Sequence, residues 1–316
     1  MQACIRSRSS YRPVSVPVIN PWSWSQPAFT RRPAFTSTWR RSACAHVSRA
    51  VCAPRPRYNG RVKIIIDTAA GSLTTVDGGS ERSLNLYSKA AFEAISHEWV
   101  RVGWSLRYYN NFSWFGRPVL QMPEDLIRLQ EVIYRVRPDV IIETGVLQGG
   151  SLMFHATLCQ ALSKGRVIGI DLHIEDKVRA AIGKHALAPH ISLVDGDSTS
   201  AEVISRVEGM IRAGESVLVI LDSGHTKDHV ARELECYSCF VTPGSYIIAT
   251  DGVMRDLADV PGGQPEWVTN NPRAAADDFA VRHPEFRHQQ PAWPFHEGDL
   301  TENVTYWPGA WLERVA

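Results

Sequence analysis

The sequence predicts an α/β protein with a Rossmann-like domain between about Arg137 and Arg314. Short apolar runs alternate with helical segments from Pro138 onward. Strands that alternate with helices in this way form a mostly parallel sheet with helices on both faces. A glycine-rich turn follows the first apolar run, at the place where such sheets bind their ligands. We therefore expect a ligand-binding domain built on a seven-stranded sheet.

The elements are assigned from apolar runs and from three- and four-residue spacing of apolar side chains. The last two segments, Phe286–Gln290 and Asn303–Trp307 continued through Trp311, are expected to add antiparallel strands at the C-terminal end. The other expected elements are strand Val140–Glu143, helix Ser151–Leu162, strand Arg166–Asp171, strand Ile191–Val194, helix Ala201–Ala213, strand Val217–Asp222, helix His229–Phe240 and strand Ser245–Thr250.

Residues 62–122 are expected to form a helical cap that precedes a methyltransferase-like domain over residues 123–316. Apolar side chains recur at helical spacing over Ser88–Val102, and an aromatic stretch follows over Trp104–Phe115. Two interpretations fit this segment. It either packs over the sheet or forms a subunit interface, or it is a lid that lines a substrate pocket. Pro123 suits the first turn of the next helix.

Residues 1–61 differ sharply in charge from the rest of the chain. They hold eleven arginines, no lysine and no acidic residue. Three interpretations fit this composition: a translated upstream region with the true start near Val62, an Arg- and Ser-rich targeting segment, or a basic arm. We expect this extension to be disordered and dispensable for folding, because it lacks the periodic apolar residues that offset ordering entropy.

Several classes of protein are excluded by composition. No apolar run approaches the roughly 18 to 20 residues that cross a bilayer. The six cysteines do not accompany a secretory signal, so a disulfide framework is not expected, and Cys236 and Cys239 are assigned to packed core thiols rather than to a metal site. We expect a cytoplasmic protein with a small-molecule partner and no nucleic-acid partner.

The glycine turn indicates which cofactor the domain takes. It reads Glu143-Thr144-Gly145, with Gly149 and Ser151 following at the start of the next helix. A dinucleotide site has glycine where Glu143 stands, because the pyrophosphate passes close to the backbone there. A carboxylate repels a pyrophosphate and attracts the ammonium and sulfonium of S-adenosylmethionine. The turn therefore favours the methyl donor over a nicotinamide cofactor.

Two further acidic residues suit an adenosine ligand. Asp171 ends the second strand, where an acid accepts hydrogen bonds from ribose hydroxyls in both cofactor classes. Asp197 follows the third strand, where an adenine ring would lie, and can accept a bond from the exocyclic amine. Asp-Gly at Asp195–Gly196 is also ordinary turn chemistry, so this second assignment is the weaker one.

Three side chains at the ends of the fourth and fifth strands could carry the chemistry. Asp222 and Asp251 end these strands, and His225 follows Asp222 by three residues. The two carboxylates are hard oxygen ligands suited to Mg²⁺. A hydroxyl is a poor nucleophile at neutral pH, and a cation or a general base such as His225 can activate it.

These motifs together resemble the cephalosporin hydroxylase family, also called the rhamnosyl O-methyltransferase family. The resemblance covers about residues 100–315 and includes Trp114–Pro118, Gly149–Ser151 and Leu221–His225. It implies a class I methyltransferase fold that is often a homo-oligomer, with Mg²⁺ beside the methyl donor and roles in natural-product and glycolipid tailoring. It also implies Asp222 and Asp251 as metal ligands and His225 as the base. The chain departs from the family at Thr250, where many relatives have glutamate.

Two other functions compete with an O-methyltransferase. A nicotinamide-dependent oxidoreductase uses a similar fold, and Glu143 argues against it. A methyltransferase-like domain that binds its ligand without turnover is the non-enzymatic alternative, and Thr250 supports it. The acceptor is not specified by the sequence: Trp114, Trp293, Trp307 and Trp311 suit a sugar or aromatic ring but also suit a core.

Overall fold

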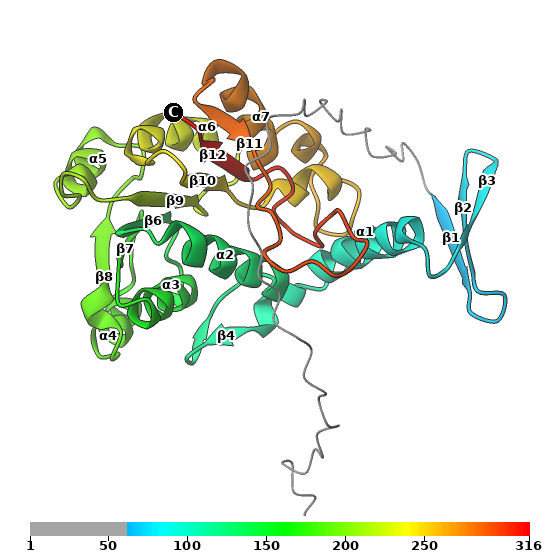
Figure 1. The fold of residues 1–316 in the computed structure, drawn as a ribbon, viewed down its shortest axis with the longest axis horizontal. Helices are drawn as coiled ribbons and strands as arrows, with labels where there is room; N and C mark the ends of the chain where they lie inside the picture. The colour runs from blue at the N-terminus through cyan, green and yellow to red at the C-terminus, as the bar shows by residue number, and fades with distance from the viewer. Residues whose placement is uncertain (1–61) are drawn as a thin grey trace, which may run out of the picture. The chain divides into compact units, whose positions relative to one another are not determined.

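A seven-stranded sheet organises the part of the chain that the computed structural model describes, residues 62–316 (Figure 1). The strand order is β11-β12-β10-β9-β6-β7-β8. The order reverses between β6 and β9, which places the ligand crevice of a doubly wound sheet beyond their carboxyl ends. The strands are β6 (Val140–Thr144), β7 (Arg166–Asp171), β8 (Ile191–Asp195), β9 (Val217–Leu221), β10 (Tyr246–Ala249), β11 (Phe286–His288) and β12 (Trp311–Arg314).

Only β12 runs against the other strands of this sheet. It pairs antiparallel with both β10 and β11, so β11 runs in the same direction as β10. The antiparallel pairing expected at the C-terminal end is therefore present, between β11 and β12 and between β12 and β10. One expectation is corrected: in the segment Asn303–Trp307 continued through Trp311, the strand begins only at Trp311 and spans Trp311–Arg314. Thr305 and Tyr306 instead bind the buried carboxylate of Asp125, which keeps that segment out of the sheet.

Helices cover both faces of the sheet, as the alternation of elements predicted. Ile141 faces one apolar cluster with α2, α3 and α4, and Ile142 faces the other with α5, α6 and α7. The first three are α2 (Pro123–Val136), α3 (Gly150–Ala161) and α4 (Asp176–Gly183); the others are α5 (Ala201–Glu208), α6 (Lys227–Tyr237) and α7 (Pro272–Arg282). The sequence patterns did not predict α4 and α7.

The region before α2 is helical in its second half only. Helix α1 spans Lys89–Ser105, and Ser88 caps it by accepting a hydrogen bond from Ala91 N. The helix expected over Ser88–Val102 is thus present, whereas the first part of the expected helical cap is an antiparallel meander of three strands, β1 (Lys63–Asp67), β2 (Ser72–Asp77) and β3 (Ser80–Asn85). Gly78 and Gly79 supply its tight second turn, since both have positive φ.

Two further predictions from the sequence concern features outside this sheet. The residues 62–316 all belong to one compact unit, and residues 1–61 lie outside the described part of the chain. Cys239 is exposed and Cys236 is half-buried, so the core assignment fits Cys159 better than this pair. No helix within residues 62–316 is long and apolar enough to cross a membrane.

Candidate functional site

The glycine turn after β6 is built around a close approach to β9. Gly145 has φ +94°, and a side chain there would collide with the carbonyl oxygen of Asp222. The turn then enters α3 through Gly149, which is left-handed, and Ser151 is buried in the first helical turn. The turn predicted from the sequence therefore lies at the carboxyl end of β6. Its Gly145 packs directly against the end of the neighbouring strand β9.

Asp171 at the end of β7 braces this turn. Its Oδ2 accepts hydrogen bonds from the backbone N–H groups of Val146 and Leu147, at 2.8 and 3.0 Å. Its Oδ1 makes only a long contact of 3.4 Å with His173 N. Oδ2 of Asp171 therefore binds the turn, and Oδ1 can accept a hydrogen bond from a ligand hydroxyl.

Asp197 lies exposed in the turn after β8. Its Oδ1 accepts hydrogen bonds from the backbone N–H and the hydroxyl of Thr199, both at 2.8 Å. These bonds lower the pKa of Asp197, so the side chain is a carboxylate at neutral pH. The bonds to Thr199 fix the position of the Asp197 side chain. The second carboxylate oxygen, Oδ2, has no hydrogen bond within residues 62–316.

Glu143 is fully buried beside the turn rather than open to it. Its Oε2 lies 3.3 Å from Nε2 of His155 on α3, and both side chains have no exposed surface. Neither carboxylate oxygen has a hydrogen bond of ordinary geometry within residues 62–316. The charge of Glu143 can therefore act on the crevice through its electric field, while direct contact with a ligand would need a side-chain movement.

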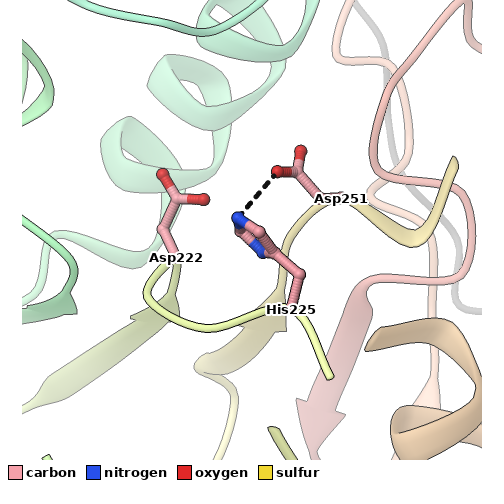
Figure 2. Close-up of side chains that lie close together, drawn as sticks. All are labelled: Asp222, His225 and Asp251. Atoms are coloured by element: carbon pink, nitrogen blue, oxygen red, sulfur yellow. Dashed lines mark ion pairs between the residues drawn. The ribbon is translucent and has the colours of Figure 1, made fainter. Parts of the chain in front are cut away.

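Asp222, His225 and Asp251 come together at the carboxyl ends of β9 and β10, as the sequence predicted (Figure 2). One ligand atom from each lies within 4.8 Å of the others. His225 Nε2 is 3.5 Å from Asp251 Oδ2. Asp251 has φ +55°, an unfavourable conformation for a residue with a side chain, and such strain is concentrated at functional sites.

Two further residues hold the Asp222 carboxylate, a role that the sequence did not indicate for either. Gln121 Nε2 donates to Asp222 Oδ2 at 3.0 Å, and the hydroxyl of Thr250 lies 2.5 Å from Oδ1. The same hydroxyl lies 2.9 Å from the carbonyl oxygen of Leu221. Gln121 stands before α2, and no periodicity or motif connects it with β9. Thr250 was noted only for the glutamate it replaces.

The two carboxylates of the cluster repel one another. Burial raises the pKa of Asp222, the negative charge of Asp251 raises it further, and His225 opposes both effects. Burial also raises the pKa of Asp251, although its side chain keeps 34% of its exposure, and His225 again opposes the shift. A cation between the two aspartates would remove this repulsion.

The donor set of this cluster fits a hard divalent cation. Two carboxylates and one imidazole can occupy half of an octahedral shell, and Mg²⁺ keeps several waters in such sites. The set holds a single histidine, so it is not the two-histidine, one-carboxylate arrangement of non-haem iron oxygenases. His225 can act either as the third ligand or as a base, because one nitrogen atom cannot do both at once.

A buried polar network holds the loop that carries His225. The hydroxyls of Ser198 and Ser223 both donate to Glu233 Oε1, at 2.6 and 2.7 Å, and Glu233 is fully buried on α6. His229 Nε2 lies 3.0 Å from the Ser223 hydroxyl, and Glu233 raises the pKa of His229. The network ties the ends of β8 and β9 to α6, so it positions the loop rather than joining the cluster.

Comparison with known proteins gives a family match over most of the chain. The model of the family Rhamnosyl O-methyltransferase/CmcI matches residues 106–315. The rhamnosyl O-methyltransferase of Mycobacterium leprae (strain TN) is 28% identical over 153 residues, which are 46% of this chain and 64% of that protein. The enzyme of the same name from Mycobacterium bovis (strain BCG / Pasteur 1173P2) is 22% identical over 164 residues, 50% of this chain and 66% of that protein. The chain thus spans just under two thirds of these relatives.

Solved structures of two methyltransferase systems resemble the chain more distantly. A structure of CmcI with Mg and SAM is 17% identical, with a TM-score of 0.45, and covers 66% of this chain and 78% of that chain. A structure of the MycE methyltransferase with Mg and SAH is 20% identical, with a TM-score of 0.39, and covers 59% and 48%. The family model matches well over half of the residues, and the chain therefore belongs to the Rhamnosyl O-methyltransferase/CmcI family.

Proposed function

We propose that the protein is an S-adenosylmethionine-dependent O-methyltransferase that acts on a hydroxyl of a small molecule, such as a sugar, a glycolipid or another natural product. The observation that carries the proposal is the Asp222–His225–Asp251 cluster at the carboxyl ends of β9 and β10, next to the switch point between β6 and β9. It lies in a chain of the Rhamnosyl O-methyltransferase/CmcI family. The curated relatives described above are named for methyl transfer to rhamnosyl groups.

The turn after β6 and the ends of β7 and β8 form the cofactor side of this site. Asp171 Oδ1 is available to a ribose hydroxyl, and the exposed Asp197 is available to an adenine amine. The field of buried Glu143 favours a positively charged ligand over a pyrophosphate. These groups support S-adenosylmethionine, and they argue against the nicotinamide-dependent alternative.

The cluster residues act on the acceptor hydroxyl. S-adenosylmethionine supplies the methyl group, and Mg²⁺, when bound by Asp222 and Asp251, supplies positive charge that favours the deprotonated hydroxyl. Nε2 of His225 takes the proton, and Asp251 at 3.5 Å stabilises the resulting imidazolium. Gln121 and Thr250 keep the Asp222 carboxylate in one orientation while this occurs.

A cavity of about 410 Å³ provides room for the acceptor. Its lining includes Trp104, Arg107, Tyr109 and Trp267, and Leu120 joins it to the neighbouring Gln121. Burial raises the pKa of Tyr109, the positive charge of Arg107 lowers it, and the negative charge of Asp251 raises it, so this wall of the cavity is within electrostatic range of the cluster. Aromatic walls of this kind suit a sugar or another ring. This arrangement favours the lid interpretation of the segment before α2.

Calorimetric titration with S-adenosylmethionine, its demethylated product and NADH tests the cofactor assignment. We expect micromolar binding of the first two and little binding of NADH. A methyl-transfer assay over a panel of glycosides and phenols, with and without chelator, tests turnover. Tight NADH binding with no response to the methyl donor would contradict the proposal, and binding without turnover on any acceptor would support the non-catalytic alternative. A homo-oligomer stays a prediction, which light scattering can check.

The acceptor cavity has a matched control in the same protein. A second cavity, also of about 410 Å³, is lined by Trp293 and by the first turn of α2. We expect Trp267→Phe to raise the acceptor KM and to leave the Kd for S-adenosylmethionine unchanged, and Trp293→Phe to change neither. Equal effects of the two variants on the acceptor KM would contradict the assignment of this cavity to the acceptor.

A further inference from the structure

The amide of Gln121 has one satisfied end and one unsatisfied end. Its Nε2 donates to Asp222 Oδ2 at 3.0 Å. Its Oε1 is buried and has no hydrogen-bond partner within residues 62–316. The whole residue is only 4% exposed. Leaving a buried acceptor without a partner costs about 1–3 kcal/mol. An unpaired buried acceptor therefore indicates a partner from outside the protein.

The orientation of this amide follows from its neighbour. A carboxylate accepts hydrogen bonds and does not donate them, so the NH₂ end of Gln121 faces Asp222. Oε1 and Nε2 share one carbon atom, so Oε1 belongs to the same amide group that binds the Asp222 carboxylate. The unsatisfied acceptor is therefore one amide group away from a residue of the Asp222–His225–Asp251 cluster.

The segment that delivers Gln121 is anchored to the cofactor side of the domain. We call residues 112–121 the strap; it contains the short strands β4 (Ser113–Trp114) and β5 (Arg117–Pro118). Trp114 Nε1 donates to the hydroxyl of Thr157 on α3 at 3.0 Å. Arg117 Nε donates to the carbonyl oxygen of Gln148 in the glycine turn at 2.7 Å.

Two backbone features show that the path of the strap is built into the sequence. A side chain at Gly150 would collide with the carbonyl oxygen of Pro118, so the first residue of α3 must be glycine for the strap to pack there. Leu120 has φ +55°, which is costly for a residue with a side chain. The protein accepts this strain directly before Gln121, and such strain is characteristic of functional positions.

We propose that Gln121 is a positioning residue that also completes the site. Its Nε2 fixes the Asp222 carboxylate, and its Oε1 accepts a hydrogen bond from a water molecule or from the acceptor hydroxyl held at the cluster. The proposal rests on the proposed function, because that function places an O–H group beside Asp222. It assigns to the strap a direct part in the site.

Gln121→Met tests the proposal, because methionine has a similar length and removes both hydrogen-bonding ends. Gln160→Met on the exposed side of α3 is the matched control. The probe is Mn²⁺ alone, followed by electron paramagnetic resonance, with thermal unfolding and the Kd for S-adenosylmethionine measured in parallel. Loss of a residue that hydrogen-bonds to a metal ligand typically lowers metal affinity by about 10- to 100-fold. We expect Gln121→Met to weaken Mn²⁺ binding by that factor and to leave the unfolding temperature and the cofactor Kd unchanged.

A crystal structure of the wild-type protein gives a second, independent readout. We expect a water or ligand oxygen within hydrogen-bond distance of both Gln121 Oε1 and an atom of the cluster. A dry Oε1 would overturn the proposal, as would wild-type Mn²⁺ affinity in Gln121→Met. A lowered unfolding temperature with unchanged Mn²⁺ affinity would reduce Gln121 to a structural residue. Failure of the proposed function would look different, because the wild type itself would then not bind S-adenosylmethionine.

Discussion

The hydroxyl of Thr250 lies 2.5 Å from Oδ1 of Asp222 and is fully buried. Thr250 therefore supports the neighbouring aspartate directly. We expect Thr250→Val, which keeps the shape and removes the hydroxyl, to lower the stability by about 1–3 kcal/mol and to lower turnover. Thr250→Ser should restore both. Denaturant unfolding and the methyl-transfer assay measure the two effects, and an active, fully stable valine variant would contradict this role.

Asp171 is expected to act on the cofactor and on the glycine turn together. Asp171→Ala removes an acceptor for a ribose hydroxyl, so binding of the methyl donor should weaken by about 1–3 kcal/mol. It also leaves the N–H groups of Val146 and Leu147 without their partner, so the melting temperature should fall. Calorimetry and thermal unfolding separate the effects. A lower melting temperature with an unchanged Kd would mean that Asp171 braces the turn alone.

His225→Ala distinguishes a base from a metal ligand. Loss of a general base costs about 100- to 10,000-fold in rate, so turnover should fall on that scale while the methyl donor still binds. If His225 acts as the base, Mn²⁺ affinity should be close to that of the wild type. If it is the third ligand of the cluster, Mn²⁺ affinity should fall with turnover. Near-normal turnover at saturating substrate would refute both roles.

Glu215 should make the stability of the domain depend on acid pH. The bidentate bonds from Arg166 lower the pKa of Glu215 from 4.5 to about 2. A lowered folded-state pKa gives stability that is present above pH 4.5 and is lost as the pH falls toward 2. Partial exposure screens the pair, so Glu215→Gln should cost about 1 kcal/mol near neutral pH and nothing near pH 2. Denaturant unfolding against pH checks this, with exposed Glu208→Gln as the control. A constant difference at every pH would contradict it.

The Arg-rich extension should be dispensable for folding. A chain that begins at Val62 is expected to keep the melting temperature of the full chain, because residues 1–61 lack periodic apolar side chains. Differential scanning calorimetry of both chains makes the comparison. Unfolding or precipitation of the shortened chain would show that the extension is structural.

Sequence patterns predicted the central sheet because its strands are continuous apolar runs. Val217–Leu221 and Tyr246–Ala249 are fully buried, and strands buried on both faces can be predicted from their continuous apolar composition. The pairing of β9 with β10 then brings Asp222 near Asp251, which is why the cluster could be predicted. The meander before α1 was missed because its strands are largely polar and exposed.

Gln121 could not be predicted in the same way. Its bond to Asp222 joins residues 101 positions apart, and only the packing of the strap on α3 and the glycine turn creates it. The burial of Glu143 against His155 was also invisible, because the charge argument from the sequence treated the carboxylate as open to the crevice. Local patterns specify elements, whereas such contacts depend on how the elements pack.

The position of β6 in the sheet has a consequence for the folding reaction. Its neighbours are β7 on one side and β9 on the other, and Val140 of β6 pairs with Val217 of β9, so half of the crevice comes from a strand that is distant in the sequence. Loop closure over that distance is slow relative to local helix formation. A refolding chain should therefore acquire helical signal before it acquires any ligand affinity. Binding of the demethylated cofactor product, followed in stopped flow, would then serve as a clock for the moment when β9 joins β6.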